Sequence, residues 1–264
     1  MAARDVAAEI FEARITVLKA RVDPLARLVH EFAASLLKPV RYHSGQEHHG
    51  YRYAKPGVEH FCLLKAARVV SSLNAMIALA RQGYIQEIHV LLRTMIEFAT
   101  HIEYVLESRD STGKLEPKAE KYVEDFFADD RRNSRDDFKK AQVPQYDVNK
   151  RLGASLDEFA RQIGADQDRV PAERLYSNVY LTFSNYVHGK YPEIMDMYGG
   201  VPEHFHLYGM HGTTKDDENI QVIATNLNTA SLTFKKMVKE LKLHHLLESD
   251  KFLLNWFESE LPPI

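Results

Sequence analysis

The stretch VEHFCLLKAARVVSSLNAMIALARQGYIQEIHVLLRTMIEFATHIEYVLE, residues 58–107, decides the fold. Its first half, from about Val58 to Gln82, is rich in Ala, Leu and Val and predicts one long helix. Gly83 follows, the residue type that best tolerates the left-handed conformation at a helix end. A second long helix starts at once and runs from about Tyr84 to Glu107. Two long helices joined by so short a turn must lie antiparallel, so this stretch predicts a helical hairpin.

Further helices are expected on both sides of this hairpin. Residues 3–37 predict a long helix in which Pro24 introduces a kink, because a proline inside a helix removes one backbone hydrogen bond. Shorter helices are expected at about 155–163 and 171–187, a long one starts near Asp216, and a last one ends near Phe257. The polar stretches at about 39–56 and 189–215 are expected to be long loops, the second with short ordered pieces.

Residues 107–140 are rich in charge, with nine basic and ten acidic side chains. One interpretation is an arm that binds nucleic acid or docks to a partner. The favoured one is an exposed helix whose opposite charges lie three or four residues apart. A narrow apolar stripe supports the exposed helix: Tyr122, Val123, Phe126 and Phe127.

The whole chain has the composition of a soluble globular protein: 264 residues, 45% hydrophobic and 27% charged, with a net charge of −3. This balance argues against a strongly basic nucleic-acid binder and leaves room for a local patch. The single cysteine, Cys62, excludes an intrachain disulfide, and we expect it in the core. The first residues lack an apolar segment, and no run of about 20 apolar residues occurs. We therefore expect a cytoplasmic protein with no membrane association.

The predicted fold class is all-α, a single antiparallel helical bundle over residues 1–264. We divide it into an N-terminal helix and loop (1–57), a core (58–240) and a C-terminal helical tail (241–264). No strand pattern and no internal repeat stands out.

A polar stripe runs along the helix expected at 84–107. Steps of 100° place five polar residues on one face, with His101 flanking them: His89, Arg93, Glu97, Thr100 and Tyr104. Arg93 and Glu97 are four residues apart and can form an ordinary surface ion pair. In the functional interpretation the stripe lines a groove between helices, where Arg93 binds an anion and Glu97 orients it.

The segment SNYVHGKY, residues 184–191, supplies the second candidate site. His188 at a helix end has an unperturbed pKa near 6.5, which suits general acid or base catalysis. A histidine there can equally cap the helix and interact with its dipole. Asn185 and Tyr191 beside it, together with Tyr104 and His101, are candidate binding residues.

The sequence gives little support for a metal or cofactor site. Histidines gather in two loops, His43, His48 and His49 beside Glu47, and His204, His206 and His211 beside Glu203. Glu203-x-x-His206 has the spacing of a di-iron ligand pair, but no second copy exists. The motifs HExxH, GxSxG, GxxxxGK[ST] and GxGxxG are absent as well. We expect no metal and no cofactor.

Two segments together resemble a known family. LLRTMIEFATHIEYVLE resembles the Arg-x-x-x-Glu helix of a bacterial domain family of unknown function, and YLTFSNYVHG resembles that family's Tyr…Ser…His helix end. Both also resemble the HEPN superfamily of small helical bundles, which are commonly dimeric and occur in toxin–antitoxin and phage-defence systems. The resemblance implies metal-independent RNA cleavage, with a His near the attacking 2′-hydroxyl and an Arg on the phosphate.

Only part of the HEPN motif is present. His188 and Gly189 match its histidine end, but Leu, Thr and Phe occupy positions 181–183, where the motif has its arginine. Arg93 is our candidate replacement, provided that the hairpin packs against the helix expected at 171–187.

Two functions follow. The first is an enzyme, a metal-independent ribonuclease or other RNA- or nucleotide-directed effector of a bacterial phage-defence or toxin system, using His188, Arg93 and Glu97. The alternative is a non-catalytic helical module that dimerises or docks to a partner protein of such a system. Convergence of the three side chains in a pocket would favour the enzyme.

Overall fold

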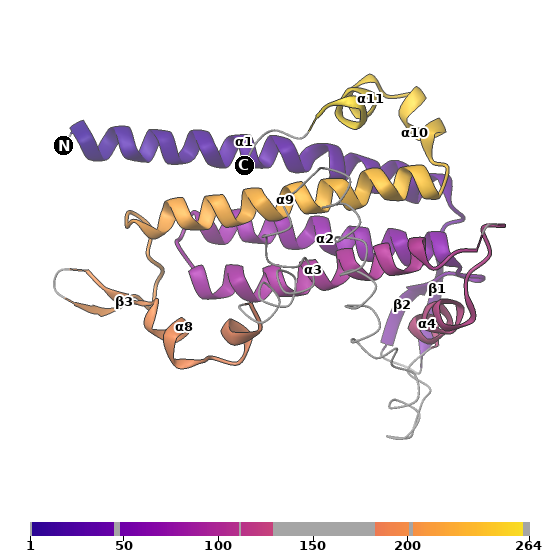
Figure 1. Ribbon diagram of the computed structural model, residues 1–264, viewed down its shortest axis with the longest axis horizontal. Helices are drawn as coiled ribbons and strands as arrows, with labels where there is room; N and C mark the ends of the chain where they lie inside the picture. The colour runs from indigo at the N-terminus through magenta and orange to yellow at the C-terminus, as the bar shows by residue number, and fades with distance from the viewer. Residues whose placement is uncertain (1, 45–47, 111, 129–182, 201–202, 261–264) are drawn as a thin grey trace, which may run out of the picture.

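The computed structural model describes residues 2–44, 48–110, 112–128, 183–200 and 203–260 (Figure 1). Four long helices form the bundle: α1 (Ala2–Ser35), α2 (Val58–Ala80), α3 (Ile85–Glu107) and α9 (Lys215–Glu240). Shorter helices follow or flank them: α4 (Pro117–Phe127), α8 (Tyr191–Met195), α10 (His244–Glu248) and α11 (Lys251–Glu258). The predicted all-α bundle is confirmed.

The core lies between the four long helices. α2 and α3 form the predicted hairpin, and α9 packs against α1, α2 and α3 (Figure 1). Phe32, Phe61, Leu92 and Phe234, one from each long helix, are fully buried. Cys62 is buried beside them, as expected, and burial raises the pKa of its thiol to about 12.

Glycine is required at the turn between α2 and α3. Gly83 has a φ of +73°, and its carbonyl accepts a hydrogen bond of 2.9 Å from the backbone N–H of Met210. A Cβ at Gly83 would lie 2.2 Å from the backbone nitrogen of His211, and one at Gly209 would lie 1.8 Å from the Gln82 carbonyl oxygen. Two chain segments therefore touch through backbone alone and fasten the loop before α9 to the hairpin turn.

A small β-hairpin corrects the prediction of a loop at residues 39–56, whereas residues 189–215 contain the short ordered pieces that were expected. Residues 39–56 contain β1 (Val40–Ser44) and β2 (His48–Arg52), which pair antiparallel with Val40 opposite Arg52. Residues 189–215 contain α8 and the two-residue strands β3 (Tyr198–Gly199) and β4 (His204–Phe205). Val40 and Tyr51 are 56% and 68% exposed, so these two apolar side chains do not give the alternating pattern of a half-buried strand.

Several predicted elements lie outside the described residues. These are positions 129–140 of the charge-rich segment, the helix expected at 155–163 and residues 171–182 of the next helix. The described remainder of that helix, residues 183–187, is helical. The first part of the charge-rich segment forms α4, whose Val123 is buried and whose flanking residues are largely exposed, as the exposed-helix interpretation predicted.

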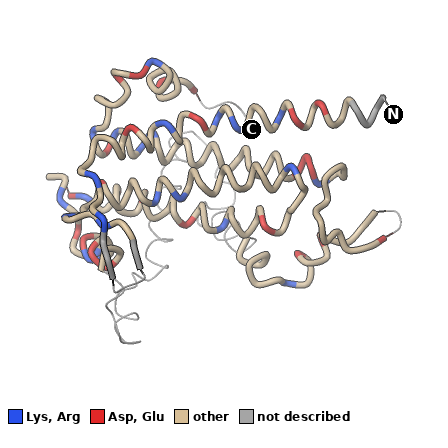
Figure 2. Tube along the Cα trace, turned by 180° about the vertical axis from the view of Figure 1, so that it is seen from behind, with Lys and Arg blue, Asp and Glu red and all other residues tan. Residues whose placement is uncertain are grey.

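Among the described helices, α2 has the length and mean hydropathy of a membrane span, which the sequence inspection did not anticipate. More than half of its most apolar window is buried in the bundle, as in the core helix of a soluble protein. Figure 2 shows positive and negative residues interspersed along α1 and gathered together at the end of the bundle that carries α4.

Candidate functional site

The polar face of α3 lies largely inside the protein. His89, Thr100 and Tyr104 are only 4%, 2% and 5% exposed. Arg93 and Glu97 form the predicted ion pair, with 3.0 Å between Nη1 and Oε1, and about a fifth of each side chain remains accessible. The pair is therefore partly desolvated, which strengthens it beyond an ordinary surface pair.

Lys65 of α2 adds a second cation beside this pair. The residue is 9% exposed, and burial lowers the pKa of its ammonium group to about 8, against the opposing effect of the Glu97 carboxylate. The charge of Glu97 thus acts on both Arg93 and Lys65. Lys65 and Arg93 therefore both place positive charge near this carboxylate when Lys65 is protonated.

Three phenylalanine rings surround the Lys65 ammonium group. Nζ lies 5.5 Å from the ring centroid of Phe61, 4.9 Å from that of Phe98 and 4.6 Å from that of Phe126. Helices α2, α3 and α4 therefore contribute one ring each. The negative faces of the rings attract the ammonium ion and partly offset its loss of hydration.

Tyr122 of α4 forms the aromatic wall of the same cluster. Its ring makes edge-to-face contacts with His101 and Tyr104, at centroid distances of 5.5 and 5.8 Å. Burial raises the pKa of the Tyr122 hydroxyl, and the nearby Tyr104 and Glu97 raise it further. Tyr122 therefore stays neutral at physiological pH, as a hydrogen-bonding and stacking group.

At the other end of the polar face, α3 meets the segment that carries His188. The His89 ring stacks on Tyr186, with centroids 4.1 Å apart and planes 16° apart, and also contacts Phe183. His89 Nδ1 lies 2.7 Å from the Ile85 carbonyl oxygen, so Nδ1 carries the proton and donates it. Burial lowers the pKa of His89, which keeps the ring neutral with its Nε2 lone pair available.

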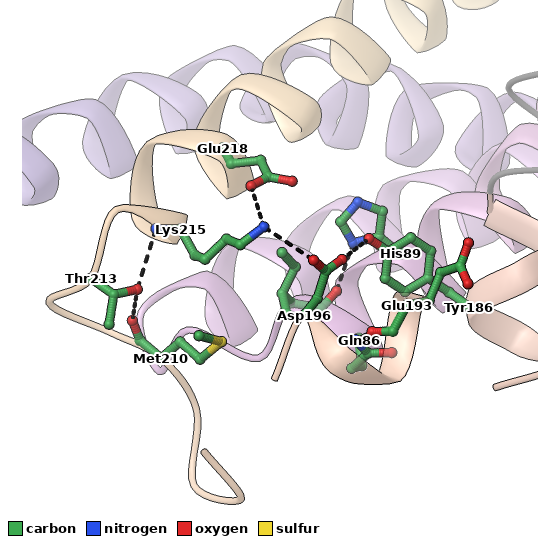
Figure 3. Close-up of polar contacts among 10 residues, drawn as sticks. Gln86, His89, Tyr186, Glu193, Asp196, Met210, Thr213, Lys215 and Glu218 are labelled. Atoms are coloured by element: carbon green, nitrogen blue, oxygen red, sulfur yellow. Dashed lines mark hydrogen bonds and ion pairs between the residues drawn. The ribbon is translucent and has the colours of Figure 1, made fainter. Parts of the chain in front are cut away.

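A chain of polar contacts continues from Tyr186 to α9 (Figure 3). The Tyr186 hydroxyl donates a 2.6 Å hydrogen bond to Asp196, and Lys215 Nζ lies 3.4 Å from Asp196 and 2.8 Å from Glu218. Burial, the hydrogen bond to Asp196 and its charge raise the pKa of Tyr186. Burial opposes the charge on Lys215, but its two carboxylate partners outweigh this and raise its pKa. The contacts join residues 183–196 to both α3 and α9.

His188 itself lies at the exposed end of the helical residues 183–187. Two residues correspond to 200° around a helix, so His188 points away from the side on which Tyr186 meets His89. Its backbone N–H bonds to the Ser184 carbonyl, and Gly189 follows with a φ of +57°, which ends the helix. The structure thus joins Arg93 to Glu97 and places His188 on a solvent-facing side.

The candidate binding residues divide between the two regions. His101 and Tyr104 lie against Tyr122, close to the Arg93–Glu97 pair. Asn185 and Tyr191 belong to the His188 segment, where Tyr191 is 78% exposed.

The sequence inspection did not single out Lys65, Tyr186 or Asp196 as site residues. For Lys65 a signal existed, because a lone lysine in the apolar run FCLLKAA is a charge in a helix expected to be buried. Nothing in the sequence indicates that Tyr186 and Asp196 meet α3 and Lys215.

Within the described residues, no group of three or more His, Cys, Asp and Glu side chains could hold a metal ion. His204 and His206 lie side by side, with ring centroids 4.2 Å apart, and His211 contacts Asp216 instead. The side chains of His43, His48 and His49 lie outside the described part of the structure.

The comparisons with known proteins place the chain in a family without giving it an activity. Neither the curated proteins nor the solved structures contain a match to it. One family model, described as a family of unknown function (DUF5677), matches residues 59–204, more than half of the chain. The matched region includes α2, α3, α4 and α8, and hence both halves of the polar face. The chain belongs to DUF5677, a protein family of unknown function.

Proposed function

We propose that this protein is an RNA- or nucleotide-directed effector, of the kind found in bacterial defence and toxin systems, and that it holds a phosphate group beside Arg93. One observation carries the proposal: Arg93 pairs with Glu97, and Lys65 lies close enough to feel the Glu97 charge, in a partly buried, aromatic-walled cluster.

The residue types suit a phosphate. The planar guanidinium of Arg93 can donate two parallel hydrogen bonds to phosphate oxygens, and Glu97 fixes its orientation. Lys65 adds positive charge without competing for the same oxygens. The rings of Tyr122 and Phe98 offer faces and edges to a nucleobase, as in proteins that bind single-stranded RNA. Partial burial strengthens each of these electrostatic contacts.

The place of His188 suits a ligand longer than one phosphate. Arg93 follows His89 by four residues, about 6 Å along the axis, and His89 stacks on Tyr186 of the His188 segment. An oligonucleotide bound at Arg93 and extending toward the start of α3 would therefore approach this segment. There His188 would serve as general acid or base in metal-independent cleavage of the RNA backbone.

Binding is tested first. A fluorescently labelled oligouridylate is titrated with the purified protein, and its anisotropy is followed at low and high salt. We expect Arg93→Gln to weaken binding by about 10- to 100-fold, the effect of losing a charge-assisted contact. Arg81→Gln is the matched control, because Arg81 is an exposed arginine in a surface pair with Glu12. Equal affinity for the wild type and a folded Arg93→Gln variant would disprove the phosphate site.

Catalysis is tested separately. Wild-type protein and His188→Ala are incubated with total RNA in the presence of a chelator, and the products are resolved on a gel. The proposal expects cleavage by the wild type and none by the variant. Binding that depends on Arg93 without any cleavage would retain the RNA site and remove the nuclease activity.

A second candidate function, a module that dimerises or docks to a partner protein, is favoured by a different observation. Large apolar side chains of residues 191–208 are exposed, most of all Tyr191, Leu207 and Tyr208, at 78%, 66% and 88%. Exposed apolar patches commonly mark interaction surfaces. Light scattering on the wild type and a Tyr208→Ser variant tests it: a dimer that the variant loses supports the module, and a monomer of the wild type counts against dimerisation.

A further inference from the structure

A groove opens between α1, α9 and α11, and none of its lining residues belongs to α2 or α3. Its volume is about 300 Å³, at the lower end of the range for small-molecule sites. α1 provides Ala20, Arg21 and Pro24, α9 provides Ser231, and α11 provides Phe252 and Trp256. Most of the exposed lining area is apolar, and the polar groups come from Arg21, Ser231, Asn255 and Ser259.

Aromatic rings form one wall of this groove. Phe252 is 45% exposed, and Trp256 is half-buried. Two cations lie near these rings: Lys235 Nζ is 5.6 Å from the Trp256 ring, and the Arg27 guanidinium carbon is 5.6 Å from the Phe252 ring. Arg27 is already neutralised by an ion pair with Asp250.

Among the described residues, no carboxylate pairs with Arg21 or Lys235. Arg21 donates to the side-chain oxygen of Asn228, and Lys235 donates to the backbone carbonyl of Ser259, so both partners are neutral. Burial lowers the pKa of each group, and no nearby acid opposes this effect. Across the described residues, neither side chain belongs to an ion pair. Partly desolvated cations without a counter-charge favour an anion in their place.

We propose that this groove binds a small organic anion with a flat apolar body, such as an aromatic carboxylate. Its ring lies against Trp256 and Phe252 over Pro24, its carboxylate accepts hydrogen bonds from Arg21, and Lys235 beside Trp256 adds a second positive charge. The apolar wall matches the body of such a molecule, and the cation in the lining, with the one beside it, matches its charge. The site is separate from the polar face of α3 and does not depend on the proposed RNA function.

The chain provides its own reporter for this site. Trp256 is the only tryptophan in the protein, so tryptophan fluorescence reports on the groove alone. Phenylacetate is titrated into the full-length protein, beside phenylacetamide, its neutral analogue, and phenethylammonium, its cationic one. We expect saturable change in the Trp256 emission with phenylacetate, about tenfold weaker binding of the amide and none of the cation. Equal binding of all three, or no saturable signal from phenylacetate, would overturn the proposal.

Substitutions then test which cations attract the carboxylate of phenylacetate. Lys235→Gln should weaken phenylacetate binding about tenfold while leaving binding of the amide unchanged. Lys239→Gln, one turn further along α9 and exposed, is the matched control and should bind as the wild type does. Arg21→Gln should act like Lys235→Gln. If both folded variants keep the wild-type preference for phenylacetate over the amide, these cations do not hold the anion. If a variant fails to fold, the comparison of phenylacetate, phenylacetamide and phenethylammonium on the wild-type protein still tests the proposal.

Discussion

Replacing Lys65 with methionine should stabilise the protein, and by an amount that depends on pH. The unfolded pKa of a lysine is about 10.5, whereas burial lowers that of Lys65 to about 8 in the folded protein. That difference of about 2.5 corresponds to about 3 kcal/mol in the free energy of unfolding. Methionine matches the length of the lysine stem, carries no charge and packs well against the phenylalanine rings.

The sign follows from the direction of the pKa change. Because the folded pKa is lower, the folded protein binds the Lys65 proton more weakly than the unfolded chain does. Charge burial therefore destabilises the wild type fully below about pH 8, and this destabilisation is lost as the pH rises from about 8 to 10.5. Attraction to the three rings offsets part of the cost at every pH where Lys65 is charged.

The assay is urea unfolding of the wild type and Lys65→Met at several pH values between 7 and about 10.5. We expect the free energy of unfolding of the variant to exceed that of the wild type by up to about 3 kcal/mol at pH 7. This difference should become smaller as Lys65 deprotonates. Lys121→Met is the control, because Lys121 is an exposed lysine on α4. The difference in stability between Lys121→Met and the wild type should not change with pH. If the difference in stability between Lys65→Met and the wild type stays constant over this pH range, Lys65 is not a buried ammonium group with a lowered pKa.

Four further changes test other parts of the structure. Tyr186→Phe removes the hydrogen bond to Asp196 and should cost about 1–2 kcal/mol, with faster amide exchange in residues 183–196 by mass spectrometry; unchanged exchange would mean that this contact does not hold the segment. Gly83→Ala forces a Cβ into backbone and should cost more than about 2 kcal/mol in urea unfolding, and more than Gly113→Ala, where φ is also positive at +84° but a Cβ would meet no atom within 4 Å. The Cys62 thiol should react with a thiol reagent only after unfolding, and rapid reaction of the native protein would contradict its burial. Asn219 is fully buried, and among the described residues neither of its amide atoms has a partner, so Asn219→Leu should raise the melting temperature by a few degrees; a lowered value would reveal a partner for the amide.

The hairpin of α2 and α3 could be predicted because its signals are local. Apolar residues repeat at helical spacing, and Gly83 adopts the left-handed conformation for which glycine is suited. The ion pair of Arg93 and Glu97 was predictable for the same reason, since their spacing on one helix brings them together.

The remaining features depend on contacts between distant segments. In the β1–β2 hairpin, Val40 and Tyr51 lie in solvent, and the sequence lacks the alternation that marks a half-buried strand. The stacking of Tyr186 on His89 joins residues 97 positions apart, and only the packing of the bundle determines it. Helical spacing placed His89 on the polar face but could not show which end of that face meets the segment containing His188.

The position of α9 has a consequence for how the chain reaches this structure during synthesis. α9 covers α2 and α3, yet it starts at Lys215, far beyond the end of α3 at Glu107, and lies outside the matched residues 59–204. On a ribosome that adds about 5–20 residues per second, the hairpin would wait on the order of 10 s for Leu227 and Phe234 to emerge and cover it. A nascent chain at that stage, or a fragment cut at the family boundaries, lacks the contacts that α9 makes with the apolar side chains of α2 and α3. Such a chain is a natural client for chaperones, and a soluble expression fragment needs to extend through the end of α9.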